Sequence, residues 1–396
     1  MPSPIEPPRI RVLFILNSLC VGGAERQVVS LINRLDRRRH EVSLVCVKEE
    51  GPLRDQLEAG SCAGGVHVLG VRKGLEWQAL RDLGRLIDGQ QIDVIVCTNM
   101  YALLYAWLAR WLCRRRPRVV EVFHTTDVGS AKERWAMRLY RPLVRSADLL
   151  VYVCHAQARH WRQRGLQARQ EVVIHNGIDT RRFADIWSDG EKQALRKSLG
   201  LPETGYVVGL CAVMRPEKAH GDLLAALARL RDEGLQVCGL LIGDGPLRAS
   251  IQAQIDALGL GDQVRITGLL DDVRPAIACC DLMALTSHAV ETFSIAALEA
   301  MTLGKPMVMS DIGGAAELVI SGDNGLLYPA GDVDALTHCL REFADPALRQ
   351  AAGRRAAALM LERFDVDPMV RGYERVFARL AARRASAGYS TVVLTD

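Results

Sequence analysis

Two glutamates eight residues apart, Glu291 and Glu299, are the first candidates for chemistry in this chain of 396 residues. Between them, Ser294 is suited to cap the start of a helix, and Gly304 before Lys305-Pro306 is suited to end it. Backbone N–H groups near the start of that helix would face an anion. Glu291 would lie in the loop before the helix and Glu299 in its second turn, so a diphosphate fits between them. The alternative is an exposed surface helix with two ordinary glutamates.

Two cations follow another apolar run, in the segment Arg215-Pro-Glu-Lys218. A guanidinium can grip a diphosphate with two parallel hydrogen bonds, and an ammonium adds a point charge. Because the segment follows a predicted parallel strand, both side chains are expected at the edge of a sheet where ligands bind. Solvated surface residues are the alternative.

Glycines and one histidine complete the set of candidates. Gly22-Gly23 opens a predicted helix directly after the first strand, where backbone N–H groups can approach a phosphate. The segment lacks the Gly-x-Gly-x-x-Gly spacing of a dinucleotide site. Gly243-Asp-Gly245-Pro predicts a turn at a strand end. His124 follows the apolar run 119–123, and its imidazole is either structural or a hydrogen-bond donor to developing charge.

Short apolar runs that alternate with helical patterns must position these residues. Continuous apolar runs are typical of strands buried on both faces, and their alternation with helices predicts parallel α/β sheets. The first half contains such runs at 10–16, 42–47, 66–69, 92–97, 119–123, 149–153 and 172–174. After a polar stretch at 185–192 the pattern restarts, with runs at 206–213, 237–242, 264–267, 282–285 and 307–309.

The restart predicts two doubly wound, Rossmann-like domains, at 1–190 and 191–367. Leu223, Leu227 and Leu230 form a core-facing stripe on one helix of the second half. The tail after residue 347 has helical composition with a break near 364–368.

Composition and charge restrict the class of protein. Apolar residues make up 49% and charged residues 24% of the chain, which are globular values. Residues 1–190 hold 29 Lys and Arg against 20 Asp and Glu, and the remainder holds 21 against 26. The basic first half indicates an anionic partner, such as a phospholipid surface or a lipid-linked phosphate, or simply a solvated basic face. No nucleic-acid partner is expected.

Cysteine usage and hydropathy indicate a cytoplasmic protein. The 11 cysteines lie mostly in apolar runs and lack zinc-ligand spacing, so free buried thiols and no metal are expected. The apolar run after Arg9 is interrupted by Asn17 and Ser18, which favours a strand over a signal peptide. No run reaches the roughly 18 apolar residues that span a bilayer.

Aromatic and basic residues gather near residues 101–118. Tyr101, Tyr105 and Trp111 have helical spacing, and Arg114-Arg-Arg-Pro-Arg118 follows them. This combination suits either a core-facing helix that ends in a basic turn or a membrane interface. It would place the protein at the inner face of a membrane in the second case.

The segment 291–301 resembles the Glu-x7-Glu signature of the retaining glycosyltransferases of family 4, with Thr292 and Ser294 in place of two usual glycines. Gly-Gly-Ala-Glu-Arg26, Arg215-Pro-Glu-Lys218 and Asn176-Gly-Ile-Asp179 are similar to further elements of that family. The resemblance implies the GT-B fold, in which two Rossmann-like domains face an interdomain cleft and the last helix, expected here at 368–396, crosses back to the first domain. It also implies front-face displacement on a nucleotide sugar, with the leaving-group oxygen taking the acceptor proton and no metal or other cofactor.

The resemblance assigns roles residue by residue. It implies that Glu291 and His124 contact the donor sugar, Glu299 the ribose hydroxyls, and Arg215 and Lys218 the pyrophosphate. The remaining nucleotide and donor contacts would come from Gly22, Gly23, Gly243, Gly245, Leu270, Thr292, Phe293, Ser294 and Ile295.

The implied activity is transfer of a sugar from a UDP- or GDP-hexose to a hydroxyl of a glycan or lipid-linked acceptor, as in bacterial surface polysaccharide or glycolipid synthesis. Two alternatives stay open at this point. One is another nucleotide-sugar enzyme of the same fold, such as a UDP-N-acetylhexosamine epimerase. The other is a noncatalytic nucleotide-sugar-binding subunit.

Overall fold

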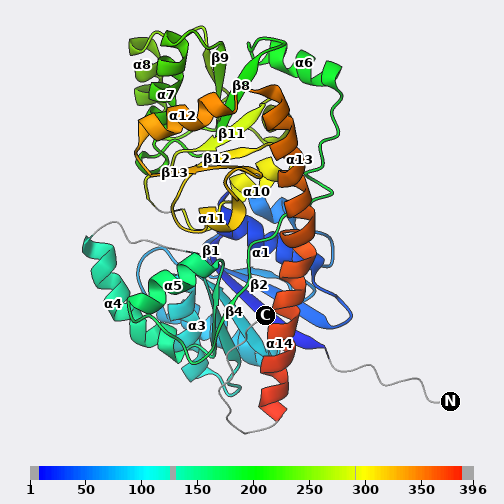
Figure 1. Cartoon of the computed structure of the whole chain (residues 1–396). Helices are drawn as coiled ribbons and strands as arrows, with labels where there is room; N and C mark the ends of the chain where they lie inside the picture. The colour runs from blue at the N-terminus through cyan, green and yellow to red at the C-terminus, as the bar shows by residue number, and fades with distance from the viewer. Residues whose placement is uncertain (1–8, 125–130, 290, 386–396) are drawn as a thin grey trace, which may run out of the picture. The chain divides into compact units, whose positions relative to one another are not determined.

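The chain divides into two compact α/β units (Figure 1). Unit 1 comprises Met1–Gly177 and Val366–Asp396, and unit 2 comprises Ile178–Asp365. The computed structural model describes residues 9–124, 131–289 and 291–385. Its units divide after residues 177 and 365, where the sequence analysis placed boundaries after 190 and 367.

Unit 1 is built on a seven-stranded sheet in the order β3-β2-β1-β4-β5-β6-β7, and all its strand pairs are parallel. The strand order reverses between β1 and β4, so the sheet is doubly wound, as predicted. Its strands are β1 (Ile10–Ser18), β2 (His40–Glu49), β3 (Val66–Val68), β4 (Val94–Thr98), β5 (Arg118–Phe123), β6 (Leu149–Tyr152) and β7 (Glu171–Val173).

Helices cover both faces of this sheet. The last helix, α14, contacts α1, β1 and β4, and so belongs to unit 1 although it ends the chain. The helical elements of unit 1 are α1 (Gly23–Arg34), η1 (Pro52–Gln56), α2 (Trp77–Gly89), α3 (Met100–Leu112), α4 (Ala131–Ser146), α5 (His155–Gln163) and α14 (Val366–Ala385).

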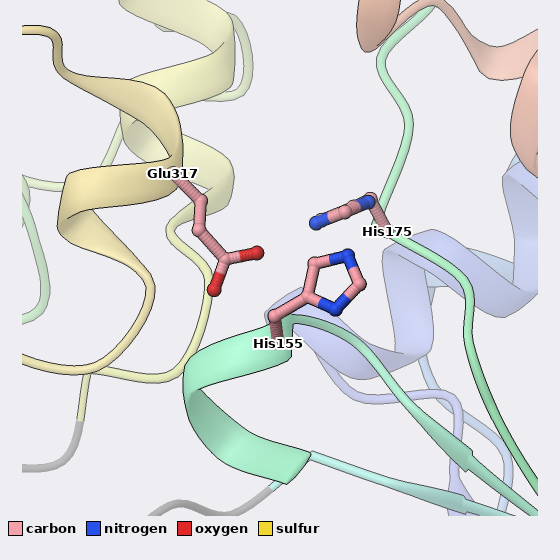
Figure 2. Close-up of side chains that lie close together, drawn as sticks. All are labelled: His155, His175 and Glu317. Atoms are coloured by element: carbon pink, nitrogen blue, oxygen red, sulfur yellow. The ribbon is translucent and has the colours of Figure 1, made fainter. Parts of the chain in front are cut away.

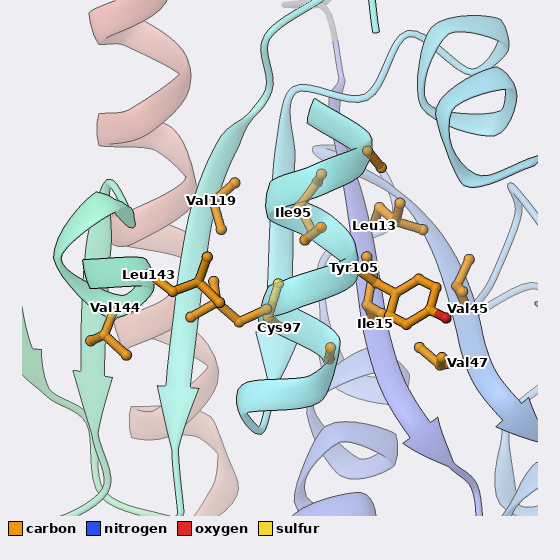
Figure 3. Close-up of a cluster of buried hydrophobic side chains, with 14 of the residues drawn as sticks. Leu13, Ile15, Val45, Val47, Ile95, Cys97, Tyr105, Val119, Leu143 and Val144 are labelled. Atoms are coloured by element: carbon orange, nitrogen blue, oxygen red, sulfur yellow. The ribbon is translucent and has the colours of Figure 1, made fainter. Parts of the chain in front are cut away.

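Figure 3 shows the core between the sheet of unit 1 and α3, where branched side chains of neighbouring strands pack together. Glu121 of β5 is fully buried, in register with Cys97 of β4 and Leu150 of β6. Neither oxygen of its carboxyl group has a hydrogen-bond partner among the described residues. Burial raises the pKa of Glu121 well above its ordinary value and so favours the protonated form of this acid.

Unit 2 has a six-stranded parallel sheet in the order β10-β9-β8-β11-β12-β13, which reverses between β8 and β11. Its strands are β8 (Tyr206–Cys211), β9 (Val237–Ile242), β10 (Val264–Ile266), β11 (Leu282–Leu285), β12 (Met307–Ser310) and β13 (Gly325–Tyr328). The first five were predicted within a few residues, and β13 was not predicted. Leu223, Leu227 and Leu230 are buried, as their spacing indicated.

The helices of unit 2 alternate with its strands, and the longest of them, α13 with 18 residues, ends the unit. They are α6 (Asp189–Ser198), η2 (Pro216–Lys218), α7 (His220–Asp232), α8 (Arg248–Ala257), α9 (Arg274–Ala278), α10 (Ile295–Thr302), α11 (Ala315–Leu318), α12 (Val333–Glu342) and α13 (Pro346–Arg363). The polar stretch 185–192 contains the start of α6, where Ser188 and Glu191 form a capping box. The predicted break near 364–368 separates α13 from α14.

All eleven cysteines are free thiols, as predicted, but only six are buried: Cys20 is exposed and four others are partly buried. Among the described helices, none combines the length and the apolar character that a bilayer span requires.

Candidate functional site

The candidate site of unit 2 lies where loops leave three neighbouring strands. Lys218 follows β8, Glu291 follows β11, and Gly313 follows β12. These strands are adjacent in the sheet, and the order reverses between β8 and β11. Because parallel strands place their carboxyl ends at one edge, the three loops meet there. A reversal point of this kind is where doubly wound sheets bind ligands.

Helix α10 begins and ends as the sequence predicted. Ser294 is its N-cap, and the Ser294 hydroxyl accepts a hydrogen bond from Ala297 N at 3.3 Å. Gly304 stands just past its end with φ +69, a conformation that glycine adopts without strain. Glu299 lies in the second turn and is only 4% exposed. The cap therefore fixes the helix start directly after the loop that carries Glu291.

Glu291 and Lys218 form an ion pair in unit 2. Lys218 Nζ donates to Glu291 Oε2 at 2.6 Å, and the Ser287 hydroxyl donates to the same oxygen at 3.1 Å. The side chains of Lys218 and Glu291 are 23% and 12% exposed. A partly buried charged pair is less screened than a surface pair, so each side chain orients the other.

Backbone contacts hold the Lys218 loop against the loop after β11. The Thr286 hydroxyl donates to the carbonyl oxygens of Lys218 and Ala219, at 2.9 and 3.0 Å. His288 N donates to Glu217 O at 3.0 Å. Ala219 has φ +44, in the left-handed region that costs an L-residue free energy. The two loops are thus fixed together while one residue stays strained.

A glycine pair after β12 supports Glu291 from the other side. Gly313 has φ +56, and a Cβ atom there would lie 1.6 Å from the carbonyl oxygen of Glu291. Gly314 N donates to Thr292 O at 2.8 Å. This pair and the Thr286 and Ser287 hydroxyls were not predicted from the sequence. A glycine pair between a strand and a helix was the available signal.

Arg215 precedes Lys218 by less than a helical turn, is exposed, and forms no salt bridge within the described part of the chain. Its guanidinium is therefore available to an anion.

The turn with Gly243 and Gly245 lies close to the loop that leads to Arg215. A Cβ atom added at Gly243 would lie 2.4 Å from Ala212 O, and one added at Gly245 would lie 2.7 Å from Met214 N. Leu270 is half-buried after β10.

His220 lies beneath this loop as the first residue of α7. It is 2% exposed, and neither ring nitrogen has a hydrogen-bond partner among the described residues. Burial, with a smaller contribution from the Lys218 charge, lowers the pKa of His220 to about 4. The ring is therefore neutral at pH 7 and adds no charge beside Lys218.

In unit 1, the predicted residues follow strand ends. Gly22 is the N-cap of α1, directly after the loop that leaves β1. His124 follows β5 and is half-buried as a residue, while desolvation of its ring lowers the pKa to about 4. His124 is therefore neutral at pH 7, with one ring N–H to donate.

Two further histidines of unit 1 lie together (Figure 2). The ring centroids of His155, the first residue of α5, and His175, which follows β7, are 5.3 Å apart. Glu317, drawn in the same figure, belongs to α11 of unit 2. Two imidazoles are fewer than the three or four protein ligands of a zinc site. Neither histidine was predicted as a site residue from the sequence.

Two protein-family models match this chain. The model described as glycosyl transferases group 1 matches residues 191–358, and the model described as Glycosyltransferase Family 4 matches residues 21–182. The chain belongs to glycosyltransferase family 4 and has the GT-B fold, so it is a transferase that uses nucleotide sugars, as the resemblance implied.

Curated relatives are similar at moderate identity. N-acetyl-alpha-D-glucosaminyl L-malate synthase of Bacillus anthracis is 27% identical over 274 residues, 69% of this chain and 70% of that protein. D-inositol 3-phosphate glycosyltransferase of Mycobacterium tuberculosis is 29% identical over 231 residues. That match covers 54% of this chain and 46% of the relative, so the chain spans about half of its length.

Solved structures match nearly the whole chain. HepE of Anabaena in complex with UDP is 26% identical, with a TM-score of 0.80, and the match covers 94% of this chain and 100% of HepE. A complex of HepE with UDP-glucose gives a TM-score of 0.81. The lipopolysaccharide galactosyltransferase WaaB shares the fold, with a TM-score of 0.67 at 18% identity.

Proposed function

We propose that this protein is a retaining hexosyltransferase that moves a hexose from a UDP- or GDP-sugar to a hydroxyl of a glycan or lipid-linked acceptor. The observation that carries the proposal is the Lys218–Glu291 pair, with the exposed guanidinium of Arg215 three residues before Lys218, at the reversal point of the unit 2 sheet. The complexes of HepE with UDP and UDP-glucose support a nucleotide-sugar donor.

Binding of the donor exchanges one ion pair for others. The diphosphate accepts hydrogen bonds from Lys218 and from the forked guanidinium of Arg215. Release of Lys218 leaves the Glu291 carboxylate free to accept hydrogen bonds from hydroxyls of the sugar. Glu299 then binds the ribose hydroxyls. Backbone groups at 292–295 and the turns with Gly243, Gly245 and Leu270 surround the rest of the donor.

Charge builds on the departing diphosphate, and fixed cations lower the energy of that state. The bond between the anomeric carbon and the phosphate oxygen breaks as the bond to the acceptor oxygen forms on the same face. The acceptor proton passes to the departing phosphate oxygen. Glu291 orients the sugar in this scheme and does not attack it. In unit 1, we assign His124 and Gly22-Gly23 as donor contacts on the family resemblance.

Donor binding tests the assignment of the cations. Lys218→Ala and Arg215→Ala should each weaken UDP-glucose binding about tenfold or more, because each removes a charge-assisted hydrogen bond. Lys197→Ala is the matched control, since Lys197 also pairs with a glutamate, Glu203 at 3.9 Å, but on exposed α6. Unchanged UDP-glucose affinity in both Lys218→Ala and Arg215→Ala would refute the assignment of these cations to the donor diphosphate.

Product analysis tests the reaction class. UDP release that requires a sugar or lipid acceptor supports transfer, with the new bond retaining the anomeric configuration of the donor. Release or epimerisation without an acceptor would favour the epimerase-like enzyme. Tight donor binding without turnover over a broad acceptor panel would favour the noncatalytic subunit.

A further inference from the structure

The end of α3 in unit 1 exposes apolar side chains that the described fold leaves uncovered. Trp111 is 65% exposed and Leu112 is 49% exposed. The ring of Trp107 packs edge-on against Trp111, with centroids 6.0 Å apart, and continues the aromatic surface along the helix. Single exposed apolar residues are ordinary, but a neighbouring tryptophan and leucine at a helix end form a patch.

This patch is surrounded by arginines. Residues 110–118 contain five of them, Arg110, Arg114, Arg115, Arg116 and Arg118, and residues 100–120 contain no aspartate or glutamate. The guanidinium of Arg116 lies 5.4 Å from the centre of the Trp111 ring. A cation over an indole face keeps its charge exposed while the aromatic surface stays in place.

Acidic groups from neighbouring elements neutralise only part of this charge. Asp148 pairs with Arg110 and Arg118 at 3.3 and 2.8 Å. Asp93 lies 3.5 Å from Arg115. Asp88 of α2 accepts hydrogen bonds from the backbone N atoms of residues 114 and 115, both at 3.1 Å. In the described chain, the guanidinium groups of residues 114 and 116 have no carboxylate partner.

We propose that this surface, formed by Trp111, Leu112, Arg114 and Arg116, docks unit 1 on an anionic membrane. A tryptophan ring suits the headgroup level of a bilayer, the leucine reaches the acyl boundary, and unpaired arginines bind lipid phosphates. A second copy of the chain is a poorer occupant, because a two-fold contact would bring the two sets of unpaired arginines together. The inference rests on the proposed function in one respect, that a lipid-linked acceptor is presented at a membrane.

Vesicle sedimentation with the full chain tests the proposal. The wild type should bind vesicles of phosphatidylglycerol and phosphatidylcholine, bind pure phosphatidylcholine weakly, and dissociate as salt screens the charges. Trp111→Ala, and separately Arg114→Ser with Arg116→Ser, should each lower the partition coefficient about tenfold. These residues lie outside the donor site, so UDP-glucose binding should not change.

Trp77→Ala is the matched control. Trp77, the first residue of α2, is 64% exposed, and its neighbour Glu76 adds a negative charge. Its replacement should leave partition within about twofold of the wild type. Absence of binding to anionic vesicles, or equal losses for Trp77→Ala and Trp111→Ala, would overturn the proposal. So would a dimer in light scattering that Trp111→Ala dissociates, since that outcome assigns the surface to self-association.

The two proposals fail separately. Vesicle binding needs no donor, and UDP-glucose binding needs no lipid. Loss of vesicle binding with intact donor binding would refute the membrane surface alone. Vesicle binding without acceptor-dependent UDP release would refute the transferase assignment alone.

Discussion

Replacement of Gly313 by alanine is the sharpest test of how unit 2 holds Glu291. The added Cβ would lie 1.6 Å from the carbonyl oxygen of Glu291 and 3.2 Å from that of Thr292. The first distance is roughly half the separation that non-bonded heavy atoms accept. The backbone at 291 must therefore move by more than about 1 Å, or the overlap must be relieved elsewhere.

The magnitude follows from two additive contributions. Holding an L-residue in the left-handed region at φ +56 costs about 1–2 kcal/mol. Overpacking against Glu291 adds about 1–3 kcal/mol. Gly322→Ala isolates the first contribution, because Gly322 has φ +81 and nothing within 4 Å of an added Cβ. We expect a loss of about 2–5 kcal/mol for Gly313→Ala and about 1–2 kcal/mol for Gly322→Ala.

Thermal unfolding and turnover measure both parts of this prediction. For a unit of this size each kcal/mol lowers Tm by about 2–4 °C. A shift of Glu291 by about 1 Å should reduce acceptor-dependent UDP release about 100-fold in Gly313→Ala. Gly322→Ala should keep wild-type turnover. Equal Tm losses in both variants, with full turnover in Gly313→Ala, would refute the reasoning.

Three other substitutions probe strained or buried groups. Glu121→Gln should become increasingly more stable than the wild type as pH rises. The raised pKa of Glu121 contributes stability to the wild type that is complete below the unfolded-state pKa of 4.5 and is lost as pH rises above it. Urea midpoints of the two proteins that stay parallel across pH would contradict this. Ala219→Gly should raise Tm slightly. Relief of about 1–2 kcal/mol of left-handed backbone strain exceeds the conformational-entropy cost of glycine, which is about 0.5–1 kcal/mol. A lower Tm would show that Ala219 is not strained. Gln27→Ala should lower the free energy of unfolding by about 2–3 kcal/mol in chemical denaturation. The buried amide of Gln27 accepts a hydrogen bond from Gly177 N at 3.0 Å and donates one to Gly177 O at 2.9 Å. A loss below about 0.5 kcal/mol would show that water replaces the side chain.

The strands could be predicted because buried parallel strands are continuous apolar runs of four to eight residues. Strand β9 (Val237–Ile242) and β11 (Leu282–Leu285) agree with the predicted ranges. The predicted run 92–97 began two residues before β4 (Val94–Thr98), because pairing with neighbours sets where a ladder starts. Strand β13 was missed because its short run begins at Gly325 directly after Gly322-Asp-Asn324, a composition that favours a turn.

The local features of the candidate site could be predicted from the sequence. Ser294 caps α10 through a bond to a residue three positions away, and Gly304 ends the same helix with its own φ. Such contacts depend on near neighbours, so residue type and spacing decide them. The parallel α/β fold was determined in the same way, by the repeated order of strand and helix.

Which groups meet at the site depends on the packing of segments that are distant in the chain. Lys218 binds Glu291 across 73 positions, and Gly313 supports that same glutamate from the loop after β12. These contacts exist because β8, β11 and β12 are neighbours in the sheet, an order that no local pattern specifies. The charged residues and the glycines are present in the sequence, and the order of the strands brings them to one edge of the sheet. Glycine is required at Gly313 because two backbones approach closely there, and the partly buried charges of Lys218 and Glu291 are stabilised by pairing with each other.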